Sequence, residues 1–125
     1  MKFTGQIEYD RVSLYIGAAD FCLAPFDPAR GEVSPLKVID YLFCGRPTVI
    51  ARIAPVEELL RQFPSLLPFV AGDARALADS MCHLLAHQPE FLDLAGKDSV
   101  AARDKYSWEK IALQIERECF SGARP

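Results

Sequence analysis

The chain has 125 residues, 50% of them hydrophobic and 25% charged, and its formal net charge at pH 7 is −3. This length suits one domain with one core, and the apolar content excludes an intrinsically disordered chain. The mixed charges exclude the basic stripe of a nucleic-acid-binding protein, and no apolar run approaches the ~18 residues that a transmembrane helix needs.

The first part of the chain is predicted to alternate between strands and helices. Helical spacing of apolar residues, short β-rich runs, and Pro or Gly between them mark the changes. We expect strands at 2–7, 21–26, 46–52 and 66–71, and helices at 10–20, 34–44 and 55–63, the second helix being closed by Gly45. Alternation of this kind implies a parallel sheet with helices on its faces, so the fold class is α/β.

The remainder of the chain is predicted to be helical. Asp73 is a good N-cap for an amphipathic helix that runs to Pro89. Two more helices are expected at 90–104 and 107–121, and Trp108 in the second is expected to pack in a core or an interface. These helices form a C-terminal tail outside the sheet, and we find no linker long enough to divide the chain into two domains.

The four cysteines, at positions 22, 44, 82 and 119, lie in apolar surroundings and form no C-x-x-C pair. We therefore expect buried free thiols, as in a cytosolic protein. The N-terminal stretch MKFTGQIEYD has no apolar segment of the kind found in signal peptides. A cytoplasmic location is expected, either free or peripheral to a membrane.

An almost wholly apolar helix is predicted after the loop DPARGEV. Ser34 is a preferred N-cap and Pro35 a preferred first helical residue. Lys37 and Asp40 alone interrupt the apolar residues, and they share one side because they are three apart. A cation in the first turn opposes the helix dipole. Two explanations of Lys37 are open. It pairs with Asp40, in which case Glu32 is a solvated loop acid, or it interacts with an anion bound at the helix end.

An anion at this helix end would meet several donors. The backbone N–H groups of Ser34, Leu36 and Lys37 would point toward it, and the lysine would add a point charge. Gly31, just ahead, would let the backbone approach the ligand closely. The site would lie at the carboxyl end of the preceding strand, where open α/β sheets bind ligands.

Other chemistry has weaker support. His83 and His87 have metal-ligand spacing on one helix, but no third ligand is evident, so no metal site is expected. Cys22 and Cys44 have no histidine nearby in the sequence and are expected to be structural rather than nucleophilic. The seven glycines form no G-x-G-x-x-G, which excludes the dinucleotide-binding fingerprint.

The stretch GEVSPLKVIDYLFCGRPTVIA resembles the donor-binding half of retaining glycosyltransferases of the GT-B fold, group 1 (family four). Those enzymes carry an acid, seven residues and a second acid across a loop and helix, which here are Glu32 and Asp40. The segments TGQIEYDRVSLYIGAADFCLAPF, GDARALADSMCHLL and YSWEKIALQI resemble flanking parts of the family, in the right order. The resemblance covers nearly the whole chain and implies a partial Rossmann-like domain followed by a helical tail.

This resemblance implies a role for each matching residue. Glu32 would be the catalytic residue, near the donor sugar and the charge that develops at its anomeric carbon. Asp40 would bind the ribose of the nucleotide, because a carboxylate can accept two hydrogen bonds from neighbouring hydroxyls. The backbone amides of Ser34, Leu36 and Lys37 would hold the diphosphate. The donor would be a nucleotide-diphosphate sugar, and no cofactor or metal is expected, since the family generally needs none.

The chain departs from the family pattern in two ways. The second acid is Asp40 where the family usually has the longer Glu. The acceptor domain and the first part of the donor domain have no counterpart, so residues 1–125 are expected to be an incomplete C-terminal donor-binding domain, inactive alone. An open sheet edge and an exposed apolar face should favour self-association or a partner polypeptide. The alternatives are a non-catalytic binding or assembly module and a remnant without function.

Overall fold

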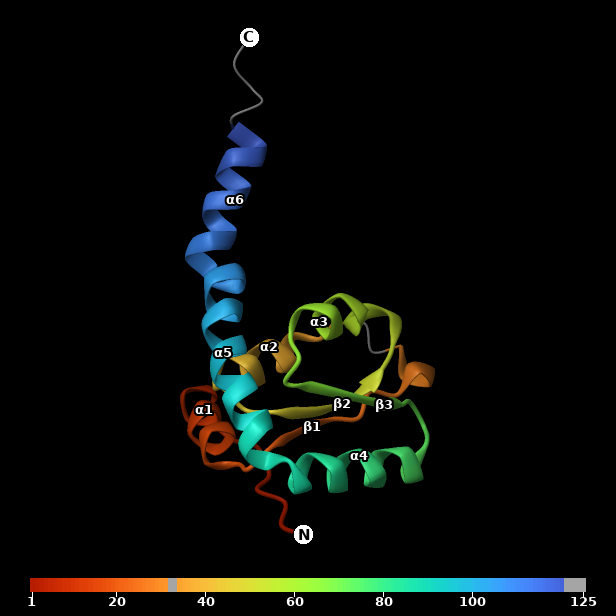
Figure 1. Cartoon of the computed structure of the whole chain (residues 1–125). Coiled ribbons are helices and arrows are strands. Elements are labelled where there is room, and N and C mark those ends of the chain that lie inside the picture. Colours follow the sequence, from red (N-terminus) through yellow and green to blue (C-terminus); the bar gives the residue numbers. More distant parts are fainter. Residues whose placement is uncertain (32–33, 121–125) are drawn as a thin grey trace.

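The computed structural model describes residues 1–31 and 34–120. Along the chain lie α1 (Tyr9–Ala18), β1 (Cys22–Ala24), α2 (Leu36–Phe43), β2 (Thr48–Arg52), α3 (Glu57–Gln62), β3 (Leu66–Val70), α4 (Ala74–Ala86), α5 (Gln88–Tyr106) and α6 (Trp108–Phe120) (Figure 1). Short 3₁₀ turns lie at Pro28–Arg30 and Ala54–Val56. The predicted helices and the last three predicted strands are all present, with ends that differ by a few residues.

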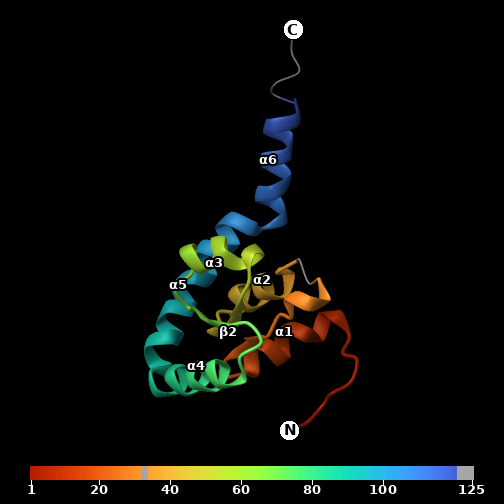
Figure 2. The same ribbon diagram turned by 90° about the vertical axis from the view of Figure 1, so that its right-hand side faces the viewer.

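The strands form one parallel sheet in the order β1-β2-β3. Leu23 pairs with Val49, and Val49 pairs with Leu67. α4 covers one face of the sheet, and α2 and α3 lie over the other (Figures 1 and 2). This confirms the predicted α/β class: a partial Rossmann-like domain with helices on both faces of a parallel sheet and a helical C-terminal tail.

The strand predicted at residues 2–7 is absent from the described structure. These residues form neither helix nor strand, and all except Ile7 are exposed. A strand is stable only where a neighbour pairs with its backbone N–H and C=O groups. The sheet of the described residues ends at β1, which pairs with β2 alone. The prediction is wrong because no strand lies in place to pair with this segment.

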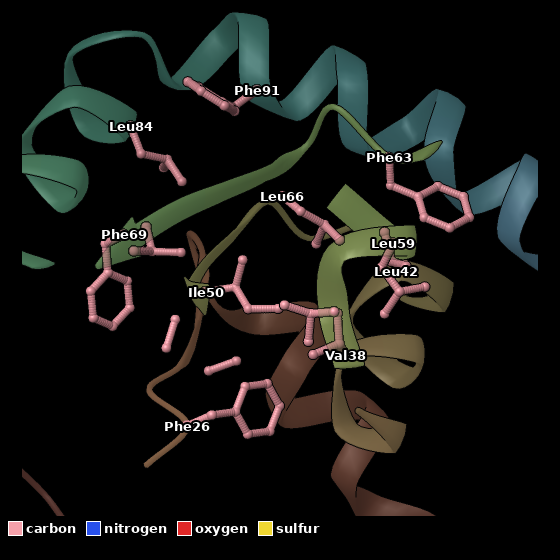
Figure 3. Close-up of a cluster of buried hydrophobic side chains, with 14 of the residues drawn as sticks. Phe26, Val38, Leu42, Ile50, Leu59, Phe63, Leu66, Phe69, Leu84 and Phe91 are labelled. Carbon is pink, nitrogen blue, oxygen red and sulfur yellow. The ribbon is translucent and has the colours of Figure 1, made fainter. Parts of the chain in front are cut away.

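One hydrophobic core joins the layers. Figure 3 shows Val38 and Leu42 of α2, Ile50 of β2 and Leu84 of α4 among its members, and each of these is at most 1% exposed. Residues 48–51 of β2 are all buried. A central strand with a neighbour on each side and a helix over each face can bury every side chain, so β2 is the axis of the domain.

The C-terminus of α2 is closed by a Schellman turn at Gly45, which confirms the predicted end of this helix. Gly45 has a φ of +63°, a left-handed conformation that glycine adopts without strain. The Arg46 N–H donates to the Tyr41 carbonyl at 3.1 Å, and the Gly45 N–H donates to the Leu42 carbonyl at 2.9 Å. The turn leads directly from the helix into β2.

The N-terminus of α2 lies later than predicted. Leu36 is the first helical residue, and Pro35 rather than Ser34 holds the cap position, without a side-chain hydrogen bond to the helix. The Pro35 carbonyl accepts the Val38 N–H at 2.8 Å, so the backbone itself closes the first turn. The prediction that Ser34 is the N-cap is therefore wrong.

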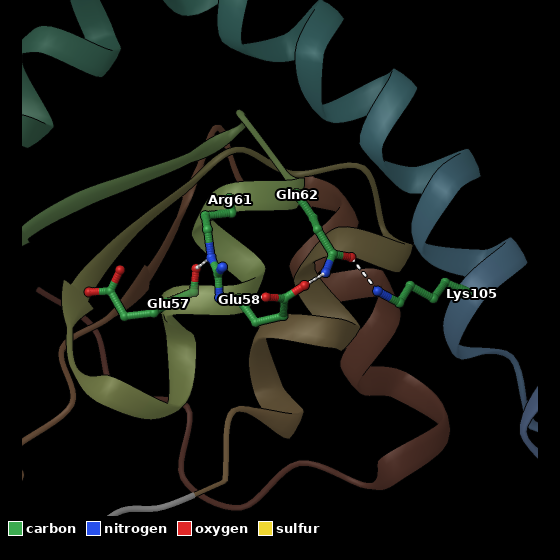
Figure 4. A network of polar contacts seen from close by, with 5 residues as sticks. All are labelled: Glu57, Glu58, Arg61, Gln62 and Lys105. Carbon is green, nitrogen blue, oxygen red and sulfur yellow. Dashed lines mark hydrogen bonds and ion pairs between the residues drawn. The ribbon is translucent and has the colours of Figure 1, made fainter.

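α5 is fixed to α3 and to the start of β3. The Asp98 carboxylate, only 6% exposed, accepts the Ser65 N–H at 2.8 Å. Lys105 donates to Gln62 at the end of α3, and Gln62 in turn donates to Glu58 (Figure 4). A buried carboxylate without a hydrogen bond is costly, so any shift of α5 that broke the Asp98–Ser65 contact would be unfavourable. This contact therefore fixes α5 against the start of β3.

α6 extends away from the sheet, on the side opposite α4 (Figures 1 and 2). No residue of this helix is buried, and the Trp108 side chain is 84% exposed. Trp108 therefore does not pack in a core, and its expected role in an interface stays a prediction. Across residues 1–31 and 34–120, no helix combines the length and apolar character needed to cross a membrane.

All four cysteines are free thiols, as predicted. Cys22 is buried and Cys44 is half-buried, whereas Cys82 and Cys119 are exposed. The prediction of burial is wrong for the last two because they lie on outward-facing positions of α4 and α6.

Gly45→Ala is expected to lower the free energy of unfolding by about 1–2 kcal/mol, because an L-residue at positive φ crowds its own carbonyl oxygen. The new Cβ would meet the Ala95 carbonyl at an ordinary 3.7 Å, so the cost is one of backbone conformation. Chemical denaturation measures the change. The matched control is Gly96→Ala inside α5. Apart from its chain neighbours and the backbone of its own helix, no described heavy atom lies within 4 Å of the added Cβ. This substitution should raise the free energy of unfolding by up to ~1 kcal/mol. Equal effects of the two substitutions would contradict this account of the turn.

Candidate functional site

The segment between β1 and α2 carries Gly31, Glu32 and Ser34, and the other predicted site residues lie on α2 itself. It leaves β1 at its carboxyl end, the edge at which open α/β sheets bind ligands. Gly31 has a φ of +67°, and no described heavy atom lies within 4 Å of where its Cβ would be. Ser34 and Leu36 are exposed, Leu36 at 71%. Gly31, Ser34 and Leu36 are therefore accessible, whereas Glu32, the predicted catalytic residue, lies outside the described residues.

The Lys37 side chain lies over the ring of Phe26. Its Nζ is 4.3 Å from the ring centroid, a cation–π contact that contributes about 0.5–1 kcal/mol at an exposed site. Phe26 is buried, at 4% exposure, and lies two residues after the end of β1. The ring therefore holds the ammonium beside the start of α2. Within the described residues Lys37 forms no ion pair with Asp40, so the local pairing considered from the sequence is not observed.

Asp40 faces different surroundings from Lys37. Together with Phe43 and Cys44 it lines a cavity of about 260 Å³ between α2 and α1. The α1 wall of this cavity consists of Tyr9, Asp10, Val12, Ser13 and Ile16. Its apolar side chains could pack against a ligand, and its carboxylates and hydroxyls could hydrogen-bond to one. Lys37 and Asp40, which were predicted to share one polar stripe, thus face two different environments: the Phe26 ring and the cavity beside α1.

Burial raises the pKa of Cys44, which lines this cavity, and the pKa values of Cys22 and Tyr41. The pKa of the Cys22 thiol is raised to about 11, chiefly because the group is buried and secondly because Cys44 lies nearby. Burial also raises the pKa of Tyr41, helped by Cys22, and the pKa of Cys44, helped by Asp40. A neutral thiol is a poor nucleophile, which supports the structural role predicted for Cys22 and Cys44.

A second hollow, of about 220 Å³, opens at the carboxyl ends of β1 and β3. Phe26 and Asp27 line it after β1, and Gly72 and Asp73 line it before α4. Asp73 accepts two backbone N–H groups at the start of α4, which confirms it as the predicted N-cap. Asp27 accepts an N–H of its own loop. Both carboxylates therefore stabilise the backbone of their own turns.

The described residues contain no group of three or more side chains placed to bind a metal ion. The rings of His83 and His87 lie with centroids 4.5 Å apart, and Nδ1 of His87 lies 2.9 Å from the His83 carbonyl oxygen. These are local contacts on the exposed side of α4.

Reasoning from sequence missed the partners that come from other segments. Phe26 lies in an apolar run that gave no sign that its ring would face Lys37. Arg103 donates to the Phe43 carbonyl at 2.6 Å across 60 residues of sequence. Local patterns report on neighbours along one element, so neither contact had a signal in the chain.

The chain is similar to known proteins in one sequence family and in one solved structure. A family model described as glycosyl transferases group 1 matches residues 1–87. The solved structure of sucrose-phosphate synthase from Thermosynechococcus elongatus aligns with a TM-score of 0.80 and 25% sequence identity, over 98% of this chain and 31% of that chain. No curated protein sequence matches at a significant level. The chain thus has the fold of part of a much longer protein.

A thiol-alkylating reagent near neutral pH is expected to label Cys82 and Cys119 of the native chain well before Cys22. Burial limits access to Cys22, and a pKa of about 11 keeps its thiol neutral. Timed labelling followed by peptide mass spectrometry measures the order, and labelling in denaturant is the control that should remove it. Rapid labelling of Cys22 in the folded chain would contradict the burial described for β1.

The same burial predicts a loss of stability at alkaline pH. Because the folded pKa of Cys22 lies above its ordinary value of 9.0, its contribution is complete below pH 9 and falls as the pH rises toward about 11. Thermal melts across this range measure the loss, which Cys22→Ala should reduce and Cys82→Ala should leave unchanged. An equal loss in Cys22→Ala would exclude this thiol as a source.

Proposed function

The chain belongs to the group 1 glycosyl transferases, and on that premise we propose that it binds the diphosphate and the sugar of a nucleotide-sugar. The whole enzyme would transfer the glycosyl group with retention at the anomeric carbon. Residues 1–125 would be an incomplete C-terminal donor-binding domain, completed by an acceptor domain or a partner polypeptide. The fold shared with part of sucrose-phosphate synthase supports this place in a larger enzyme.

The observation that carries the proposal is the environment at the N-terminus of α2. Among the described residues no side chain caps this helix, and the Lys37 ammonium is held beside its first turn by the Phe26 ring. The positive end of the helix dipole and a lysine together favour a bound anion. In the proposed complex the amides of Ser34, Leu36 and Lys37 hold the diphosphate, and Gly31 lets the backbone approach it.

Asp40 is the proposed ribose ligand. It lies one turn along α2 from the amides, is exposed, and borders the cavity toward α1. A carboxylate can accept hydrogen bonds from both ribose hydroxyls. Because aspartate is one methylene shorter than the glutamate usual in the family, the ribose would have to lie closer to α2.

Glu32 is the proposed catalytic residue. Its carboxylate would lie near the donor sugar and stabilise the positive charge that develops at the anomeric carbon, while the helix end holds the diphosphate leaving group. The helix dipole and Lys37 would supply the positive charge opposite the diphosphate, so the proposal includes no metal ion or cofactor.

The remaining parts of the reaction belong to the larger enzyme. The chain corresponds to 31% of the related sucrose-phosphate synthase chain, so an acceptor site would lie elsewhere and the isolated chain would be inactive. We place this enzyme in the cytoplasm, either free or peripheral to a membrane.

A second candidate function is that of a non-catalytic binding or assembly module. The observation that favours it is uncovered apolar surface: Trp108 of α6 is 84% exposed, and Leu23 of the edge strand β1 is 37% exposed. The two functions differ in their need for Glu32. Glu32→Ala would abolish glycosyl transfer by the assembled enzyme but leave an assembly role intact.

Titration of the 125-residue chain with UDP, GDP and their sugar derivatives is expected to shift the backbone amide NMR signals of residues 31–40. Asp40→Ala should weaken nucleotide binding by about tenfold, a change equivalent to ~1.4 kcal/mol and typical of one hydrogen bond to a charged group. The matched control is Asp79→Ala, an exposed acid on α4 that should bind as the unaltered chain does. A dispersed spectrum whose amide signals do not shift when any of these nucleotides or nucleotide-sugars is added would contradict donor binding and favour the assembly module.

The isolated chain is expected to self-associate, because an edge strand presents unpaired backbone groups to other chains. Light scattering at increasing concentration measures this. Leu23→Lys, which places a charge on the edge strand, should reduce association, whereas Leu85→Lys on the exposed side of α4 should not. A monodisperse monomer at high concentration would contradict the expectation.

A further inference from the structure

We propose that Ser99 and Arg103 of α5 are positioning residues for the α2 site: they hold the C-terminus of α2 and so orient Asp40 at the cavity. This inference rests on the proposed function, because it assigns a task to the helix that would hold the donor. Both residues lie outside residues 1–87, the part of the chain that the family model matches.

Two donors from α5 converge on one carbonyl group. The Phe43 oxygen accepts the Ser99 hydroxyl at 3.0 Å and the Arg103 guanidinium at 2.6 Å. Phe43 is the last residue of α2, and its carbonyl belongs to the final turn, whose carbonyl groups lack partners within the helix. A guanidinium at this position also interacts favourably with the negative end of the helix dipole.

The other carbonyls of the final turn have partners in the chain segment that follows. The Asp40 carbonyl accepts the Cys44 N–H at 3.0 Å, and the Tyr41 and Leu42 carbonyls accept the N–H groups of the Schellman turn. The Phe43 carbonyl is thus the group of the final turn that accepts hydrogen bonds from a different element. α5 occupies that position with a hydroxyl and a cation.

α5 can set the orientation of α2 because α5 is itself fixed elsewhere. The buried Asp98 carboxylate binds the Ser65 N–H before β3, and Lys105 binds Gln62 of α3. These contacts flank Ser99 and Arg103 along α5, so the two donors stand on an immobilised stretch. Through α5, the position of the C-terminus of α2 is therefore coupled to β3 and α3 as well as to the loop that follows α2.

The end of α2 is mechanically close to the site. The helix has eight residues, which span about 12 Å, and Asp40 lies three residues before Phe43. A single helix of this length moves as a rigid rod, so a rotation at Phe43 turns the Asp40 carboxylate and displaces the amides of Leu36 and Lys37. Residues on α5 would in this way act on a ligand that they do not touch.

The first test uses the ligand-free chain of 125 residues and its amide NMR spectrum. Arg103→Ala and Ser99→Ala are expected to shift the amide signals of Leu36, Lys37 and Asp40 in addition to those of the final turn. Arg103→Lys, which keeps a cation near the carbonyl, should restore most of the original positions. The matched control is Lys97→Ala, whose side chain pairs with Asp93 within α5, and whose effects should stay within that helix. Shifts confined to residues 41–46 would overturn the proposal.

The second test measures UDP and GDP affinity by titration. Arg103→Ala is expected to weaken binding by up to about tenfold, the loss expected for Asp40→Ala, because it would misplace that carboxylate. Arg103→Lys should recover most of the affinity. Equal affinity of Arg103→Ala and the unaltered chain would overturn the positioning role and leave donor binding standing. If the unaltered chain binds neither nucleotide, the proposed function fails, and the ligand-free spectra still decide whether α5 orients α2.

Discussion

Parallel pairing of β1, β2 and β3 is the constraint on which the rest of the fold depends. Two parallel strands cannot be joined by a tight turn, so each connection crosses a face of the sheet, and α2 and α3 make these crossings. The strand order is β1-β2-β3, so two crossings of the same hand lie over the same face, as α2 and α3 do. The same pairing brings the carboxyl ends of the strands to one edge, where the segment toward α2 begins. The candidate site therefore owes its location to topology, and its residues add only the chemistry.

α2 is held very differently at its two ends. Its final turn is closed by the Schellman turn at Gly45 and by donors from α5 on the Phe43 carbonyl. Its first turn has no side-chain cap from residues 1–31 or 34–120 and carries Lys37, which the Phe26 ring holds in place. Positive charge is favourable at the end of a helix and unfavourable at its start unless an anion is present. This asymmetry is the physical link between the packing of α2 and the donor site proposed at its start.

The outer surfaces of the domain are covered unevenly. β2 is buried on both sides, whereas β1 ends the sheet of the described residues and α6 buries none of its side chains. Small domains bury a smaller fraction of their surface than large ones and are correspondingly less stable. The related sucrose-phosphate synthase has the same fold over 98% of this chain but is about three times as long, since the match covers 31% of it. This member of the group 1 glycosyl transferases thus spans about a third of the length of that similar protein.

The sequence by itself determined the elements whose signals are local. Periodicity placed the helices, β-rich runs between turn residues placed three strands, and Asp73 and Gly45 marked helix ends through their own backbone preferences. It also predicted a donor site at Gly31, Glu32, Ser34, Leu36, Lys37 and Asp40, from the cation in the first turn of the helix and from the resemblance to group 1 glycosyltransferases, and this site stays a prediction. Tertiary structure decided what depends on a second segment: whether residues 2–7 find a strand to pair with, which cysteines are covered, what Lys37 faces, and what binds the Phe43 carbonyl. The physical reason is that a helix or turn is specified by groups a few residues apart, whereas strand pairing, burial and the partners of a helix end are supplied by residues far away in the chain.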